Sequence, residues 1–117
     1  MLIHYLVLDE PEVGRWQSGL YLLSGRAKPA ARTFPLPLAV AGRSGGSTVL
    51  WGQVRARSGV QSYRLQARRP GAPWAWLGGT RRTTARGFVS ARVALPRGTV
   101  VRLWSPADDV FGVSVAL

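Results

Sequence analysis

The chain has 117 residues, of which 46% are hydrophobic, so it is long and apolar enough for one ordinary domain and is not an intrinsically disordered protein. It has no cysteine and a single histidine, His4, which excludes disulfide bonds and thiolate zinc sites and disfavours histidine-dependent metal or catalytic sites. No apolar run approaches the roughly 18 residues that a membrane-spanning helix needs. We therefore expect no metal, no cofactor and no membrane span.

The net charge of +11 comes almost entirely from arginine, because Lys28 is the only lysine among the 16 basic residues. Such a balance raises binding to nucleic acid or to an anionic surface as a hypothesis. The arginines are spread over the predicted strands and turns and form no single block, and a genome rich in G and C would also favour arginine. Solvated strand faces are thus the preferred interpretation, and nucleic-acid binding is the less favoured one.

The first forty residues differ in pattern from the remainder. Residues 2–8 are apolar on both sides, as in a strand of a buried parallel sheet. A short extended piece is expected at 20–23 and a short helix at 28–34, with Pro29 in its first turn. One strand and one short helix cannot bury their own apolar surface. This segment is therefore expected to need a partner, either the following domain or a missing upstream one.

A domain boundary is predicted between residues 40 and 41. Residues 38–40 are expected to form a short edge strand, and the glycine- and serine-rich stretch 42–47 a linker. The first long strand is predicted at 48–57. Its alternation places Leu50, Gly52, Val54 and Ala56 on an inner side, and Trp51, Gln53, Arg55 and Arg57 on the outer side.

Further strands follow at roughly ten-residue intervals, separated by glycine or proline. They are expected at 61–69, 74–77, 80–84, 88–95, 99–104 and 110–117. Regular short strands with turn residues between them are typical of an antiparallel β-sandwich. The predicted fold class for residues 41–117 is therefore all-β.

Two adjacent acids, Asp9 and Glu10, follow the predicted strand 2–8. General acid–base catalysis on a glycoside needs two carboxyl groups facing each other across about 5–10 Å. Neighbouring side chains at one strand end usually point apart, so the pattern favours a helix cap or a loop salt bridge. No catalytic residue is predicted.

Tryptophan is frequent for a chain of this size. Sugars stack on exposed indole rings through their apolar C–H faces, so outward-facing tryptophans permit a carbohydrate-binding face; Trp51, Trp74 and Trp76 are the candidates. The alternative is that each ring seals an edge of the sandwich, which is the more common role. Aromatic residues interleaved with arginine could also stack on single-stranded nucleic acid, but no nucleic-acid-binding motif and no phosphate-binding loop is present.

Several stretches resemble the C-terminal end of secreted glycoside hydrolases of actinobacterial type. The most specific are Trp-Gln-Ser-Gly-Leu at 16–20 and Gly-Arg-Ala-Lys-Pro-Ala at 25–30, and the resemblance begins at 3–11. Trp-Gly-Gln-Val-Arg at 51–55 and Arg-Gly-Phe at 86–88 resemble the small sandwich that follows the catalytic barrel in such proteins.

This resemblance implies that residues 1–40 are the remnant of a (β/α)8 barrel. Within it, 3–8 would be the eighth strand, 15–20 a loop over the sugar site and 28–34 the last helix. Residues 41–117 would form an immunoglobulin-like or fibronectin-III-like accessory domain. An extracellular location and an upstream catalytic barrel as partner are further implications of the resemblance.

The resemblance also bears on activity. The family's two catalytic glutamates lie at the ends of the fourth and seventh barrel strands, and neither strand is present here. We therefore expect no enzymatic activity, with at most a substrate-lining role for Asp9, Glu10 and Trp16. The function expected is that of a structural or carbohydrate-associated accessory region. The alternatives are an autonomous carbohydrate-binding module that uses exposed tryptophans and, less favoured, a basic nucleic-acid-binding domain.

Overall fold

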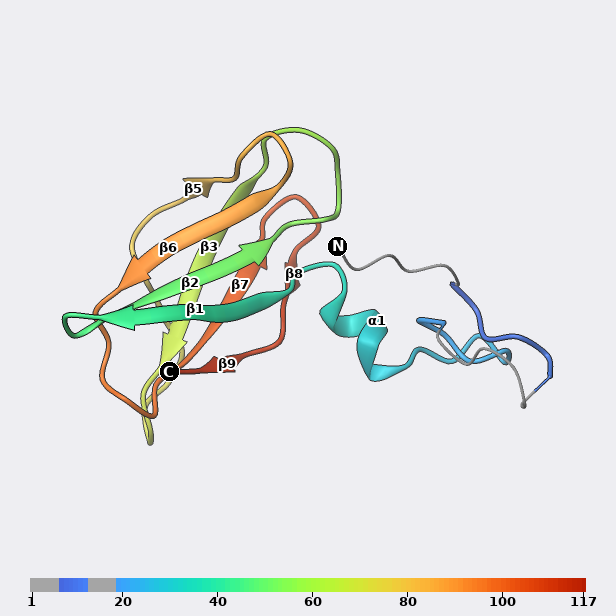
Figure 1. Ribbon diagram of the computed structural model, residues 1–117, viewed down its shortest axis with the longest axis horizontal. Coiled ribbons are helices and arrows are strands. Elements are labelled where there is room, and N and C mark those ends of the chain that lie inside the picture. The colour runs from blue at the N-terminus through green and yellow to red at the C-terminus, as the bar shows by residue number, and fades with distance from the viewer. Residues whose placement is uncertain (1–6, 13–18) are drawn as a thin grey trace. The chain divides into compact units, whose positions relative to one another are not determined.

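The computed structural model describes residues 7–12 and 19–117 (Figure 1). The chain divides into two compact units, Met1–Phe34 and Pro35–Leu117. This division lies before the boundary expected between residues 40 and 41. Most of the predicted strand 2–8 falls outside the described residues, as does most of the predicted loop 15–20.

The described residues of the first unit include a short helix, α1 (Pro29–Thr33), with proline at its start as expected. Upstream of it, Leu8 and Tyr21 form a parallel bridge, and Tyr21 and Ala27 form an antiparallel one. Tyr21 donates its backbone N–H to Val7 O, and Asp9 donates its own to Tyr21 O, both at 2.9 Å. Of the extended piece expected at 20–23, only Tyr21 takes part in β-bridges.

The second unit consists of two antiparallel sheets, which confirms the all-β prediction for this part of the chain (Figure 1). One sheet has the order β1-β2-β6, and the other has the order β4-β3-β7-β8, with β5 paired to β3 and β9 paired to β7. The strands are β1 (Leu38–Ser44), β2 (Ser47–Gln53), β3 (Ser62–Arg68), β4 (Ala75–Trp76), β5 (Arg81–Arg82), β6 (Phe88–Val93), β7 (Val100–Ser105), β8 (Val110–Phe111) and β9 (Val115–Ala116).

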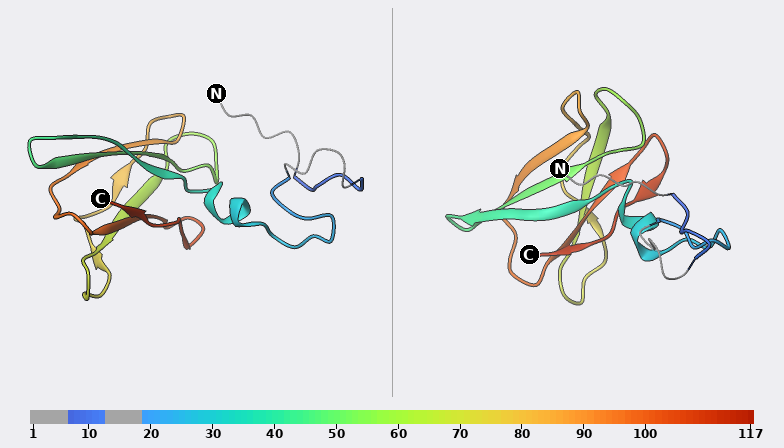
Figure 2. Two further views of the ribbon diagram at one scale, coloured as in Figure 1. Left: turned by 60° about the horizontal axis from the view of Figure 1, so that its bottom comes forward. Right: turned by 45° about the vertical axis from the view of Figure 1, so that its right-hand side comes forward.

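Both sheets contribute to one hydrophobic core, and Figure 2 shows them as two layers. Leu50 on β2 and Val89 on β6 are buried on the inner side of the first sheet, and Leu65 on β3 and Leu103 on β7 on that of the second. Burying each of these side chains contributes about 1.5–3 kcal/mol. The alternation predicted along these strands is confirmed: inner positions are buried, and the outer positions of β3 and β7 are left for polar and aromatic side chains.

The glycine-rich stretch predicted as a linker is instead the turn of the β1–β2 hairpin, so the linker prediction was wrong. Gly45 and Gly46 have φ angles of +55° and +76°, which a tight hairpin turn requires and which glycine adopts without steric cost. The edge strand expected at 38–40 extends through this stretch to Ser44. A β-bulge between Val40 and Gly42 shifts the register of β1 against β2.

The strand predicted at 48–57 ends at Gln53. Beyond it the chain leaves the sheet, since Val54 N–H donates to Gly87 O and Arg55 N–H to Pro35 O. Val54 is still buried, but Ala56 is exposed, in contrast to the prediction.

The last predicted strand is interrupted. This strand, 110–117, is divided into β8 and β9, which both pair with β7. Gly112 lies at the break, where a Cβ atom would come within 2.5 Å of Leu36 O, and its N–H donates to Leu103 O. The separate strands predicted at 74–77 and 80–84 correspond to the shorter β4 and β5, which both pair with β3, with Gly78 and Gly79 between them.

Gly87 is expected to be intolerant of any side chain. Its φ is +76°, and an added Cβ atom would clash with the carbonyl oxygen of Val54. Gly59 is a matched control, because its φ is +83° and a Cβ atom there would meet nothing within 4 Å. Urea denaturation should show that Gly59→Ala costs about 1 kcal/mol of unfolding free energy and Gly87→Ala about 3 kcal/mol, since only the latter adds overpacking to the backbone term. Equal losses would contradict the described contact.

Candidate functional site

The outer side of the six-stranded sheet carries a continuous set of aromatic and arginine side chains. Cross-strand pairing brings them together: Arg64 lies opposite Trp104, and Gln66 lies between Arg102 on β7 and Trp76 on β4. Side chains opposite each other in adjacent strands share a face. We call this surface the aromatic–arginine face, and it comprises Arg64, Gln66, Arg68, Trp74, Trp76, Arg102, Trp104 and Phe111.

Three rings from three strands form the aromatic centre of this face. The Trp76 and Trp104 centroids are 5.3 Å apart, and Phe111 lies 6.3 Å from Trp76 and 6.2 Å from Trp104. These separations are typical of interacting aromatic pairs. Trp76 and Phe111 are exposed, so the cluster is open to solvent.

Guanidinium groups lie against the rings. Arg64 is 3.9 Å from the Trp76 ring centroid, while Arg102 is 3.9 Å from that of Phe111 and 4.1 Å from that of Trp74. Arg68 lies 5.0 Å from the Trp74 ring. A cation over the face of an aromatic ring is attracted by the ring quadrupole, which contributes about 0.5–1 kcal/mol at exposed sites.

Arg102 forms two hydrogen bonds within the face. Its Nε and Nη2 both donate to Gln66 Oε1, at 3.0 and 2.8 Å. Burial lowers the pKa of the Arg102 guanidinium from its usual value, and the nearby positive charge of Arg68 lowers this pKa further. The neutral amide oxygen of Gln66 thus stabilises the charged form of Arg102, which burial and the charge of Arg68 destabilise.

The loop between β7 and β8 contacts the aromatic–arginine face at Trp104. Trp104 Nε1 donates to Asp109 Oδ1 at 3.0 Å, and Asp109 has a φ of +49°. Ser105 Oγ donates to Asp108 Oδ2 at 3.1 Å. These contacts order the loop that leads to Phe111.

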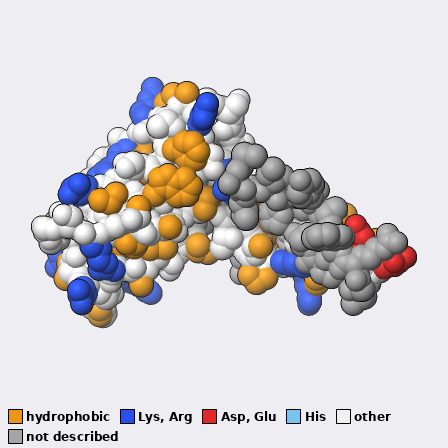
Figure 3. Space-filling model, in the orientation of Figure 1, with side chains coloured by type: hydrophobic (Ala, Val, Ile, Leu, Met, Phe, Trp, Pro, Cys, Tyr) orange, Lys and Arg blue, Asp and Glu red, His pale blue; other side chains and the backbone are white. Residues whose placement is uncertain are grey.

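The predicted tryptophans do not form one site. Trp74 and Trp76 belong to the aromatic–arginine face, whereas Trp51 is exposed on β2 of the other sheet, with its ring centroid 5.6 Å from that of Phe88. Figure 3 shows hydrophobic side chains gathered over that three-stranded sheet, with arginines scattered around them. Trp16 lies outside the described residues.

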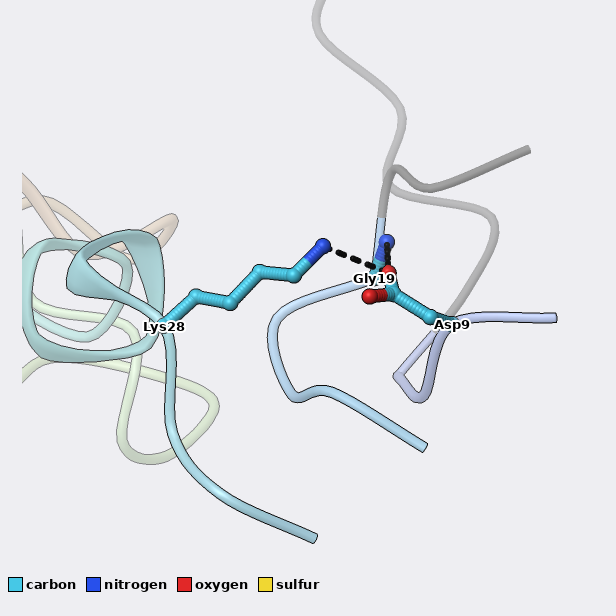
Figure 4. Close-up of polar contacts among 3 residues, drawn as sticks. All are labelled: Asp9, Gly19 and Lys28. Atoms are coloured by element: carbon cyan, nitrogen blue, oxygen red, sulfur yellow. Dashed lines mark hydrogen bonds and ion pairs between the residues drawn. The ribbon is translucent and has the colours of Figure 1, made fainter. Parts of the chain in front are cut away.

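Asp9 accepts hydrogen bonds from two other parts of the first unit. It is 5% exposed, and its Oδ1 accepts from Gly19 N–H at 3.0 Å and from Lys28 Nζ at 2.5 Å (Figure 4). A Cβ atom at position 19 would lie 2.5 Å from the Leu8 carbonyl carbon, so glycine is needed for this close approach. The Asp9 carboxylate is therefore engaged in a salt bridge within its own loop. Glu10 is only half-buried.

The sequence pattern identifies Trp74 and Trp76 as candidate site residues, but it does not show that the other members of the face lie beside them. The alternation of β3 and β7 marks Arg64, Arg102 and Trp104 as outward-facing, so their signal was present. Phe111 could not be found in this way, because the break at Gly112 divides its strand.

Among residues 7–12 and 19–117, no helix is long and apolar enough to cross a membrane. In the same part of the chain, no group of three or more His, Cys, Asp or Glu side chains could hold a metal ion.

No family model matches this chain, and no curated protein and no solved structure is significantly similar to it. The resemblance to a glycoside hydrolase terminus therefore remains a prediction from the sequence motifs.

Removing Lys28 should loosen the first unit selectively. Lys28→Ala would leave the buried Asp9 carboxylate without its cation, and breaking a buried ion pair in this way costs about 3–5 kcal/mol. Hydrogen–deuterium exchange should become faster at the amides of Asp9 and Tyr21, while the β3 and β7 amides keep their protection. Arg26→Ala, at an exposed position, is the control. Unchanged exchange at Tyr21 would show that the ion pair does not stabilise this unit.

The Gln66–Arg102 contact should show a measurable coupling energy. In a double-mutant cycle of Gln66→Ala and Arg102→Ala, followed by urea denaturation, we expect about 1–2 kcal/mol of coupling, since two hydrogen bonds to a charged group are lost together. Gln66→Ala with Arg92→Ala, on the other sheet, should be additive within about 0.5 kcal/mol. Additivity in both cycles would exclude a stabilising role for this contact.

Proposed function

We propose that this chain is a non-catalytic, carbohydrate-associated accessory region that binds saccharide on the aromatic–arginine face. The observation that carries the proposal is the gathering of Trp76, Trp104 and Phe111 on one open sheet surface, beside arginine side chains that can donate hydrogen bonds. Clustered, exposed aromatic residues on a soluble domain mark interaction surfaces. Saccharide recognition combines apolar contact with rings and hydrogen bonds to hydroxyl groups, and this face offers both.

The strand order supports an immunoglobulin-like arrangement for Pro35–Leu117. Strands β1, β2 and β6 would be the first, second and fifth strands of such a sandwich, and β3 and β7 the third and sixth. The interrupted pair β8 and β9 would together be the seventh strand, and β4 with β5 an additional edge strand. Broken outer strands beside a regular β3–β7 centre are consistent with this assignment.

The wider context proposed for the chain is a secreted polysaccharide-degrading enzyme with a catalytic barrel upstream. Its support is the sequence resemblance, together with the division of the chain into two units after Phe34. In this proposal the accessory region brings no catalytic glutamates and contributes substrate contacts only.

Affinity electrophoresis through gels that contain soluble polysaccharides, together with pull-down on insoluble ones, tests the proposal. Trp76→Ala and Trp104→Ala should each weaken retention at least tenfold, because central aromatic residues dominate binding surfaces. Trp51→Ala is the matched control: this tryptophan is also exposed but lies on the other sheet, so retention should not change.

Thermal melting of each variant separates lost binding from lost folding. Retention that is lost in Trp51→Ala but kept in Trp76→Ala and Trp104→Ala would place the site on the other sheet. An absence of retention on every glycan would contradict saccharide binding, and sugar release by the purified chain would contradict a non-catalytic role.

A further inference from the structure

Resting on the proposed function, we infer that the aromatic–arginine face binds the carboxylate groups of a polysaccharide that contains uronic acid. The juxtaposition that carries the inference is three arginines held by aromatic rings on one open surface, with no carboxylate paired to any of them among the described residues.

The charge on this face is unbalanced. The ion pairs within the described part of the chain join Lys28 to Asp9 and Arg57 to Asp108. Arg64, Arg68 and Arg102 have no such partner there. Of the two acids in the loop between β7 and β8, Asp108 pairs with Arg57, and Asp109 accepts a hydrogen bond from Trp104. A surface with one sign of charge concentrates ligands of the opposite sign.

The guanidinium groups are held in place by protein contacts, but not all of their N–H groups donate hydrogen bonds. Arg102 uses Nε and Nη2 on a single oxygen of Gln66, which leaves its remaining N–H groups for another acceptor. Arg64 makes one long hydrogen bond, from Nη2 to Gly78 O at 3.5 Å. Planar guanidinium groups with free N–H donors match the two oxygens of a carboxylate.

An anionic ligand would also relieve a local repulsion. Burial lowers the pKa of Arg102, and so does the charge of Arg68. A carboxylate placed near both would stabilise the two cations. Beyond Arg68, a pocket lined by Arg69, Pro70 and Gly98 extends the basic surface past the rings.

The ring contacts favour this ligand over its competitors. Stacking of a neutral sugar or a nucleic-acid base needs an open ring face. Here guanidinium groups lie over the rings of Trp74, Trp76 and Phe111, which reduces the ring area open for stacking. The groups best placed to meet a ligand are therefore the arginine N–H donors together with the ring edges, and an acidic saccharide can use both.

The experiment compares polygalacturonate with its fully methyl-esterified form, which has the same backbone without the charge, using the whole chain. Binding to polygalacturonate should be at least tenfold tighter and should weaken with added salt. Arg68→Gln and Arg64→Gln should each lower the affinity about tenfold, because a charged hydrogen bond is lost. Arg92→Gln and Arg97→Gln, which remove exposed arginines outside the face, should leave it unchanged.

Arg68 is exposed, so Arg68→Gln should melt close to the unmodified protein, and the test does not depend on the more buried Arg102. Equal binding of the ester and the acid would overturn the inference while leaving saccharide binding in place. Equal or tighter binding of single-stranded DNA or dextran sulfate at matched charge would also overturn it, because the face would then be a general polyanion surface. Failure to retain any polymer, neutral polysaccharides included, would overturn both proposals.

Discussion

The antiparallel pairing of β3 with β7 is the constraint on which the rest of the second unit depends. One side of the pair places Leu65 beside Leu103 in the core, and the other side places Gln66 beside Arg102 in the aromatic–arginine face. Because side chains alternate along both strands, the register that buries the leucines also fixes the arginine against its amide partner. A shift of one residue would exchange the two sets, so core packing and the geometry of the outer face cannot vary independently.

The aromatic–arginine face compensates for the partial burial of a charged side chain. Arg102 is partly buried and lies near another cation, and both effects disfavour its charged form. Two rings and one amide oxygen compensate for the water that the guanidinium has lost. The long arginine side chains also cover the apolar rings, which would otherwise form a bare hydrophobic patch on a broad sheet surface.

The core could be predicted from the local sequence pattern, but the turns and the strand pairings could not. Leu50, Leu65 and Val89 follow a period of two that is visible in the sequence, and they are buried as expected. The sequence alone predicts a linker where the structure has the hairpin turn at Gly45 and Gly46. Glycine is typical of both flexible segments and tight turns, and only the partner strand distinguishes the two. Phe111 lies beside Trp104 because β8 pairs with β7, and this pairing cannot be predicted from a local sequence pattern.

The bulge in β1 has a consequence for self-association. Strands β1 and β6 are the two outer strands of the three-stranded sheet, and an open strand can recruit another molecule and extend the sheet without limit. The register shift between Val40 and Gly42 interrupts the regular row of donors and acceptors along β1, and Arg43 adds a charge next to it. On β6, Arg92 is exposed and gives the opposite edge a repulsive charge. Both features disfavour the pairing of these two edge strands with another molecule.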